Sequence, residues 1–123
     1  MNSKIEEELE RSGKILQTTI GDSMEPMLQN RQNIVVIEKA DGLLKKYDLP
    51  LYRRPNGKYV LHRILKVRKN DYIICGDNRI RRETVPHEWI IGVVSGYYKG
   101  KKFISVKDRK YLLYVHIWCD FYY

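Results

Sequence analysis

Short runs rich in apolar residues recur along the chain, and residues typical of turns separate them. Such runs, rich in β-branched and aromatic side chains and bounded by turn signals, predict strands. The strands are expected over residues 14–20, 33–37, 58–67, 72–75 and 89–94, with a further hairpin over residues 96–105. Many short strands at close spacing favour an all-β fold, built as a folded sheet or a partly closed barrel.

Proline and glycine refine this pattern. Pro50 interrupts the partly alternating residues 47–52. Because proline cannot donate a hydrogen bond to a sheet ladder, we expect an edge strand or a bulge there. Pro55, Asn56 and Gly57 form a strong hairpin-turn signal ahead of the next strand.

Both ends of the chain differ from this β pattern. Residues 1–13 predict a short N-terminal helix or arm, because Asn2 or Ser3 can cap a helix. Residues 111–123 form an aromatic tail, which predicts a terminal helix or strand. We favour its packing on the domain over a position at a membrane interface. With a core over about residues 14–105, the chain fits one domain.

The composition indicates a folded and basic protein. Hydrophobic residues make up 43% and charged residues 31% of the chain, and the formal net charge is +8. That charge favours anionic partners, although a solvated basic face explains it equally well. Arg79, Arg81 and Arg82 could contact phosphate, but a solvated loop is the favoured interpretation. Nucleic acid is the weaker partner, because no recognised nucleic-acid motif is present.

Cysteine and histidine spacing predicts neither a metal site nor a cofactor. The residues concerned form no CxxC pair and no ligand cluster; they are Cys75, Cys119, His62, His87 and His116. Buried thiols fit the two cysteines better than a disulfide. We expect His87 at the surface of a loop and His116 in a packing role.

Hydropathy bears on where the protein acts. The N-terminus is charged and lacks the apolar core of a signal peptide, and no run reaches the roughly 18–20 apolar residues of a membrane span. We therefore expect a cytoplasmic protein. Peripheral membrane contact is expected, if at all, through the basic face or the aromatic tail.

Three residues carry candidate chemistry. Ser23 lies between a tight turn and a proline, His62 lies within an apolar strand pattern, and Asp77 lies in a turn after a strand. Each residue alone is common in a purely structural role. Together they suggest nucleophilic acyl transfer, in which a histidine takes the serine proton and an acid orients the histidine.

The residues around these positions resemble the signal peptidase I family and the related self-cleaving repressor peptidases. Gly21, Ser23, Met24 and Pro26 match the G-x-S-M-x-P nucleophile box of that family. In bacterial signal peptidases a strand then carries a lysine base followed by arginine, and this chain has His62 and Arg63 there. The histidine is similar to the endoplasmic-reticulum and archaeal type.

Two further segments extend the resemblance over about residues 14–98. Gly76, Asp77 and Asn78 match the G-D-N box, and residues 85–92 match a V-P-x-x-x-I-x-G segment. The resemblance implies a small serine peptidase on a signal-peptidase-like fold. It also implies a peptide or precursor-protein substrate with small residues before the cut.

The resemblance also implies a role for each site residue. Ser23 resembles the nucleophile, and its backbone N–H is the natural oxyanion donor in the turn formed with Gly21. His62 resembles the general base, for which a histidine needs no strong desolvation near neutral pH. Asp77 resembles the acid that holds the histidine. Supporting positions are Met24, Pro26, Arg63, Gly76 and Asn78.

The chain departs from the family in several ways. It lacks the N-terminal membrane span, the large cap domain and the upstream DNA-binding domain of different relatives, and Glu83 is only a loose match for a second acid after the G-D-N box. Two other classes of function stay open. One is a non-catalytic module that binds peptide or an anionic surface, and the other is a basic nucleic-acid binder.

Overall fold

The computed structural model describes residues 4–18, 33–40, 42–77 and 81–122, and within these residues the chain is mainly β with a helix near each end. The N-terminal elements are α1 (Lys4–Ser12), β1 (Lys14–Thr18) and β2 (Asn33–Lys39). The middle of the chain forms β3 (Pro50–Arg53), β4 (Tyr59–Leu61), β5 (Arg63–Val67), β6 (Asp71–Cys75) and β7 (Glu83–Pro86). A 3-10 turn (His87–Trp89), β8 (Ile90–Lys99), β9 (Lys102–Ser105) and α2 (Arg109–Tyr122) complete it. The predicted all-β class with short terminal helices is confirmed.

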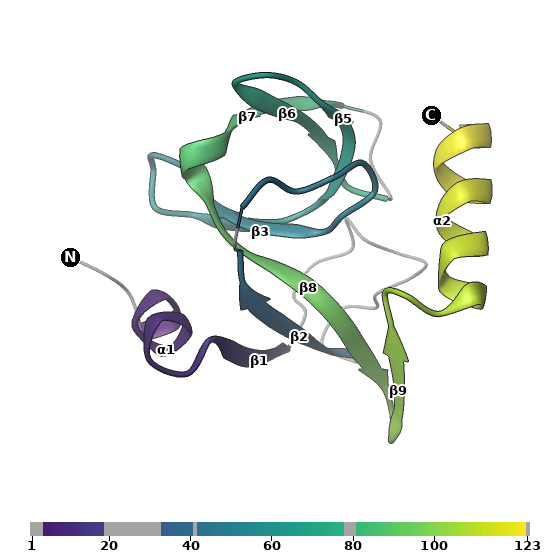
Figure 1. Ribbon diagram of the computed structural model, residues 1–123, viewed down its shortest axis with the longest axis horizontal. Coiled ribbons are helices and arrows are strands. Elements are labelled where there is room, and N and C mark those ends of the chain that lie inside the picture. The colour runs from purple at the N-terminus through teal and green to yellow at the C-terminus, as the bar shows by residue number, and fades with distance from the viewer. Residues whose placement is uncertain (1–3, 19–32, 41, 78–80, 123) are drawn as a thin grey trace.

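The strands form two antiparallel sheets (Figure 1). The larger sheet has the order β1-β2-β8-β3-β4, and β9 also pairs with β8. The long strand β8 is its centre, because it pairs with β2, β3 and β9 along its length. The smaller sheet has the order β5-β6-β7. The short strand β7, which the sequence pattern did not predict, adds the third strand.

The chain passes from one sheet to the other at His62. Leu61 pairs with Leu51 in the larger sheet, whereas Arg63 pairs with Cys75 in the smaller one. The single strand expected over residues 58–67 is therefore wrong, since the segment forms two strands with one residue between them. Alternation gives the faces of a strand but not the partner strand, so it could not reveal this break.

Of the two features expected at Pro50, an edge strand or a bulge, the structure has the irregularity and not the edge. β3 lies between β8 and β4, so it is not an edge strand. Proline is tolerated because it is the first residue of the strand, where a ladder donor is not required. The register between β3 and β8 shifts between Leu51 and Tyr52, so the predicted irregularity is present.

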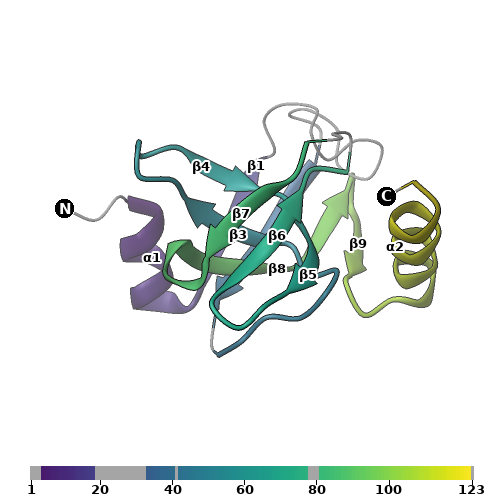
Figure 2. The same ribbon diagram turned by 90° about the horizontal axis from the view of Figure 1, so that it is seen from above.

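Two apolar clusters hold these layers together. The smaller cluster fills the space between β3 and the β5–β7 sheet, and its buried members are Tyr52, Ile64, Tyr72, Ile74 and Val85. The larger cluster joins α1 and α2 to the larger sheet through residues such as Leu9, Val35, Val94 and Val115. The helices α1 and α2 lie at opposite ends of the molecule in both ribbon views (Figures 1 and 2).

The aromatic tail forms the helix α2. Tyr111 and Val115, one turn apart, are buried in the larger cluster, whereas Leu112 and Leu113 are exposed. The predicted packing on the domain is therefore confirmed for one face of the helix. In the part of the chain that the structure describes, no helix is long and apolar enough to cross a membrane.

Candidate active site

His62 lies half-buried at the junction of the two sheets, between β4 and β5. The ring of Tyr52 approaches it edge-on, with 6.5 Å between ring centroids. Tyr52 is fully buried at the centre of the smaller cluster. One side of the imidazole thus faces a buried aromatic ring of the smaller cluster.

Next to His62, Arg63 and Asp77 form a buried ion pair. Arg63 donates from Nε to Asp77 Oδ1 at 2.7 Å and from Nη2 to Asp77 Oδ2 at 2.9 Å. Both side chains are 0% exposed. Burial by itself lowers the pKa of Arg63, but the charge and the hydrogen bonds of Asp77 outweigh it and raise that pKa above its ordinary value. Arg63 therefore stays charged, and the pair ties β5 to the turn that follows β6.

Two tyrosines of α2 complete the polar shell of this pair. The hydroxyl of Tyr114 donates to Asp77 Oδ2 at 2.7 Å, and Arg63 Nη1 donates to the hydroxyl of Tyr111 at 2.8 Å. Arg63 Nη1 also donates to the carbonyl oxygen of Tyr47 at 3.0 Å. Burying both charges is costly unless their hydrogen bonds are satisfied, so the C-terminal helix is part of what makes this ion pair stable.

A second carboxylate, that of Glu83, lies close enough to His62 for a charge–charge interaction. Tyr52 donates its hydroxyl proton to Glu83 Oε1 at 2.7 Å. Arg54 donates from Nη2 to the same oxygen at 2.8 Å and from Nε to Oε2 at 3.0 Å. The hydrogen bonds from Arg54 lower the pKa of Glu83 against the effect of burial, and His62, whenever it carries a positive charge, acts in the same direction as the smallest of the causes. Glu83 is therefore an anion near the imidazole.

The environment of Glu83 also affects Tyr52. Burial first, and then the hydrogen bond to Glu83, raises the pKa of the Tyr52 phenol above its ordinary value. Tyr52 therefore stays a neutral donor near neutral pH, while its ring faces His62. One tyrosine thus connects the imidazole and the carboxylate.

The structure brings together some of the predicted site residues and leaves others undescribed. Arg63 contacts Asp77 directly, and the buried Gly76 precedes this aspartate in the chain. The predicted residues Gly21, Ser23, Met24, Pro26 and Asn78 lie outside the described residues. Asp77 contacts Arg63 and Tyr114, and its expected role of holding His62 stays a prediction.

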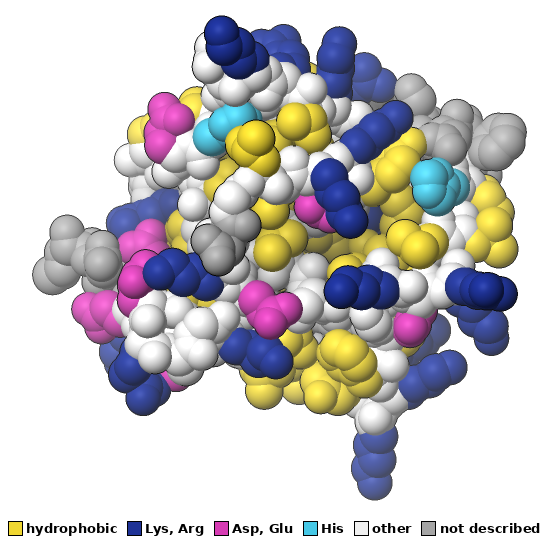
Figure 3. All heavy atoms as spheres, viewed as in Figure 1, with side chains coloured by type: hydrophobic (Ala, Val, Ile, Leu, Met, Phe, Trp, Pro, Cys, Tyr) yellow, Lys and Arg dark blue, Asp and Glu magenta, His cyan; other side chains and the backbone are white. Residues whose placement is uncertain are grey.

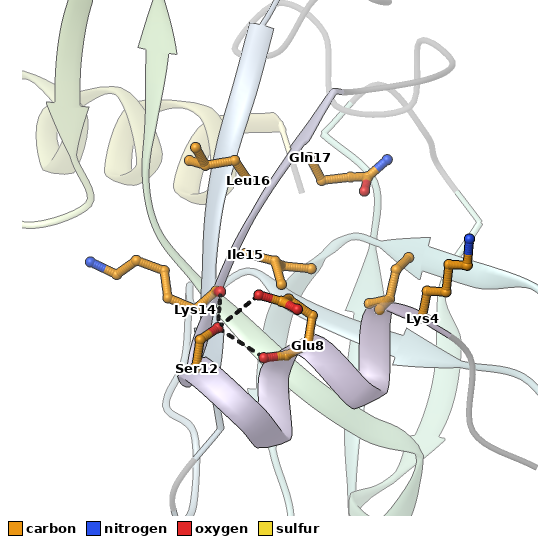
Figure 4. Close-up of a pocket in the computed structure, with 8 residues that line it drawn as sticks. Lys4, Glu8, Ser12, Lys14, Ile15, Leu16 and Gln17 are labelled. Carbon is orange, nitrogen blue, oxygen red and sulfur yellow. Dashed lines mark hydrogen bonds between the residues drawn. The ribbon is translucent and has the colours of Figure 1, made fainter.

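A groove lies between α1 and β1, and Figure 4 shows the residues that line it. Its volume is about 750 Å³. Charged and apolar side chains share its lining. The hydroxyl oxygen of the exposed Ser12 lies 2.9 Å from the carbonyl oxygens of both Glu8 and Lys14, and its single proton is donated to one or the other. Among the described strands, β1 pairs with β2 alone, so the groove runs along a sheet edge.

Three other sequence expectations can be compared with the structure. His87 is not a surface residue, because it is half-buried with its ring centroid 4.4 Å from that of Tyr72. His116 packs edge-on against Tyr47 at 5.1 Å. Cys75 is a buried thiol. Within the described ranges, no three histidine, cysteine, aspartate or glutamate residues are grouped so that they could hold a metal ion.

Sequence reasoning gave little weight to two parts of the site. Glu83 was a loose match, although its place in the sequence after the G-D-N box did point to it. The tyrosines of α2 gave no signal beyond their spacing of three residues, because their partners lie far away in the sequence. No protein-family model and no curated protein matches this chain.

Proposed function

We propose that this protein is a serine endopeptidase, which cleaves a peptide, leader or precursor protein through an acyl-enzyme on Ser23 with His62 as the general base. The placement of His62 carries the proposal. The imidazole is half-buried at a sheet junction, next to the buried Arg63–Asp77 pair and within the charge field of Glu83. A restrained imidazole near an anion suits a group that must accept a proton and hold the resulting positive charge.

The proposed reaction needs no cofactor. The Ser23 hydroxyl attacks the scissile carbonyl carbon while His62 accepts its proton, and the backbone N–H of Ser23 stabilises the developing oxyanion. His62 then gives the proton to the leaving amine as the C–N bond breaks. Water, activated by His62 in the same way, attacks the ester and releases the acyl product with Ser23 restored.

Two carboxylates can serve as the acid of this mechanism, and we favour a division of roles. Asp77 neutralises the buried Arg63 and thereby fixes the start of β5, directly after His62. Glu83 accepts the hydroxyl proton of Tyr52, whose ring faces His62, so this carboxylate lies near the imidazole and is suited to stabilise the imidazolium that forms when Ser23 is deprotonated. Under this proposal Glu83 is the electrostatic partner of the base and Asp77 is a positioning residue.

The groove beside β1 supports a peptide substrate. An extended peptide can add to an exposed sheet edge by main-chain hydrogen bonds, with side chains entering adjacent grooves. β1 is such an edge among the described strands, and it ends at Thr18, shortly before Ser23 in the sequence. A substrate along β1 would therefore pair with the strand that precedes the Ser23 segment in the sequence.

The proposal is tested by mass-spectrometric cleavage profiling of a diverse peptide library. The chain is compared with Ser23→Ala and His62→Ala, and with Ser95→Ala and His116→Gln as control variants at other positions. Cuts made by the wild type and both controls, but lost in the two site variants, are the expected result. Cuts that survive Ser23→Ala would overturn the proposal. Peptide binding by all five proteins without any cut would instead support the non-catalytic binding module.

A further inference from the structure

The helix α2 has two faces of different character. Its inward face buries Tyr111 and Val115, which are 6% and 1% exposed. Its outward face carries three large aliphatic side chains, Leu112, Leu113 and Ile117, which are 43%, 61% and 46% exposed. At 3.6 residues per turn these three positions form one stripe on the side away from the sheets. Exposing three such side chains together to water costs free energy, so an apolar stripe of this kind indicates an interaction site.

Positive charge lies on the residues that directly precede this stripe in the chain. The segment that runs from the β8–β9 turn into α2 presents six exposed cationic side chains, Lys99, Lys101, Lys102, Lys107, Arg109 and Lys110. It contains one acid, Asp108, whose Oδ2 accepts a hydrogen bond from the Ser105 backbone N–H. Phe103 on β9 adds an aromatic ring that is 44% exposed.

The two parts of this surface lie next to each other. β9 and the first turn of α2 are side by side in both ribbon views (Figures 1 and 2). In the space-filling view, dark blue side chains gather over the β8–β9 hairpin and the start of α2, near yellow hydrophobic ones (Figure 3). We name this combination the α2 surface, which consists of the aliphatic stripe, Phe103 and the six cations.

The chemistry of the α2 surface selects among partners. A nucleic acid would use the cations but would leave the aliphatic stripe in water. A second copy of the chain would bring the six cations of each α2 surface together. The repulsion between like charges opposes that contact in a protein of net charge +8. An anionic bilayer satisfies both halves, because aliphatic side chains enter the acyl boundary while lysine and arginine meet phosphate groups.

We propose that the α2 surface docks the protein on bilayers that contain anionic phospholipids, with α2 lying in the plane of the interface. The proposal does not depend on peptidase activity.

Vesicle flotation tests this inference with the full chain. The probes are vesicles of phosphatidylcholine alone and vesicles of phosphatidylcholine with phosphatidylglycerol. The wild type should float with the second kind and not with the first. Rising salt should weaken the binding, because the cations contribute through screened charge.

Matched variants separate the α2 surface from general basicity. Leu113→Ser with Ile117→Ser removes most of the stripe, and its control, Leu16→Ser with Leu43→Ser, removes two leucines of comparable exposure elsewhere. Replacing Lys107, Arg109 and Lys110 by glutamine lowers the charge by three, and so does its control, glutamine at the exposed Lys58, Lys66 and Lys69. Each α2 variant should weaken vesicle binding at least about tenfold, and each control should stay within about twofold of the wild type.

Circular dichroism of each variant verifies that the fold is retained, as expected for exposed positions. Three results would overturn the inference. The first is no flotation of the wild type with either kind of vesicle. The second is an equal loss in the two charge variants, which would show a diffuse effect of net charge. The third is a wild type that forms dimers by sedimentation equilibrium, with the dimer lost in Leu113→Ser with Ile117→Ser and no vesicle binding.

Discussion

The carboxylate of Asp77 faces the guanidinium of Arg63 through two parallel hydrogen bonds, and neither side chain is exposed to solvent. A bidentate pair of this kind adds geometric precision as well as energy. Because Arg63 directly follows His62, the pair fixes the backbone at the point where the chain enters the smaller sheet. The candidate base is therefore held in place by a contact that the base itself does not make.

Removing one partner of this pair should destabilise the fold strongly. Asp77→Ala leaves the charge of Arg63 buried without its counter-ion, which costs about 3–5 kcal/mol. Asp71→Ala is the matched control, because it breaks an exposed ion pair in which Arg68 Nε and Asp71 Oδ1 are 2.6 Å apart. This change should lower the free energy of unfolding by about 1 kcal/mol or less. Urea unfolding measures both changes. Equal losses in the two variants would contradict a structural role for the buried pair.

The hydroxyl of Tyr114 should contribute to the same network. Tyr114→Phe keeps the ring and removes a hydrogen bond to a buried carboxylate, so we expect a loss of about 1.5–3 kcal/mol in the free energy of unfolding. Tyr98→Phe, a change at a half-buried tyrosine on β8, serves as the control for loss of a hydroxyl group. An unfolding midpoint for Tyr114→Phe that coincides with that of Tyr98→Phe would show that α2 adds nothing to the ion pair.

Stability should depend on pH through Glu83. Its pKa lies below the ordinary value, with the hydrogen bonds of Arg54 as the largest cause. A carboxyl group whose pKa is lower in the folded state stabilises the fold above its unfolded pKa and loses this contribution as the pH falls through its folded pKa. The free energy of unfolding should therefore decrease as the pH falls from about 5 toward 3.

The variant Glu83→Gln isolates this contribution. Its stability deficit relative to the wild type should be largest above about pH 5 and should shrink as the pH falls, because protonation removes the same charge in the wild type. Asp71 and Glu8 also have lowered pKa values through hydrogen bonds from Arg68 and Arg11, and they are present in both proteins, so they cancel in the difference. The exposed Glu88, changed to glutamine, provides the control. A deficit that stays constant with pH would remove the assignment to Glu83.

Glu83 should also affect peptide cleavage, through its charge near His62. If His62 is the base, cleavage should increase from about pH 5 to 8 as the imidazole loses its proton. Glu83→Gln should lower kcat by at least about a hundredfold with little change in KM, because the anion stabilises a charge that exists only during the reaction. Its acidic limb should move to lower pH, since an imidazolium without a nearby anion loses its proton more readily.

Cleavage assays of Glu83→Gln and Glu88→Gln at matched folded fractions check this prediction. A flat profile over the same pH range would argue against His62 as the base. An unchanged acidic limb in Glu83→Gln would instead separate Glu83 from the imidazole and return the role of the acid to Asp77.

Much of the strand pattern could be predicted, because alternation and turn residues are local signals. The runs that became β2, β6 and the β8–β9 hairpin were expected, and the turn at Gly100 has the positive φ of 63° that favours glycine. The break at His62 could not be predicted, since apolar runs lie close to it on both sides, at residues 59–61 and 64–65. The change of sheet depends on pairing with Leu51 and Cys75, which lie elsewhere in the chain.

The candidate site was predictable in part. The motifs pointed to His62 and Asp77, but pattern alone could not pair Asp77 with Arg63, because that contact exists only after β5 and β6 have folded side by side. The helix α2 stayed undecided at the sequence level, since aromatic residues suit both strands and buried helix faces. Its contribution of Tyr111 and Tyr114 to the polar core depends on tertiary packing alone.

The junction at His62 has a consequence for how activity could be tuned. One residue joins the two sheets, and Tyr52, Ile64 and Tyr72 pack together in the buried cluster between β3 and the smaller sheet. A small rotation of one sheet against the other would change the position of the His62 imidazole. Substitutions that repack these buried residues would then change the rate of turnover, although none of the residues needs to touch a substrate.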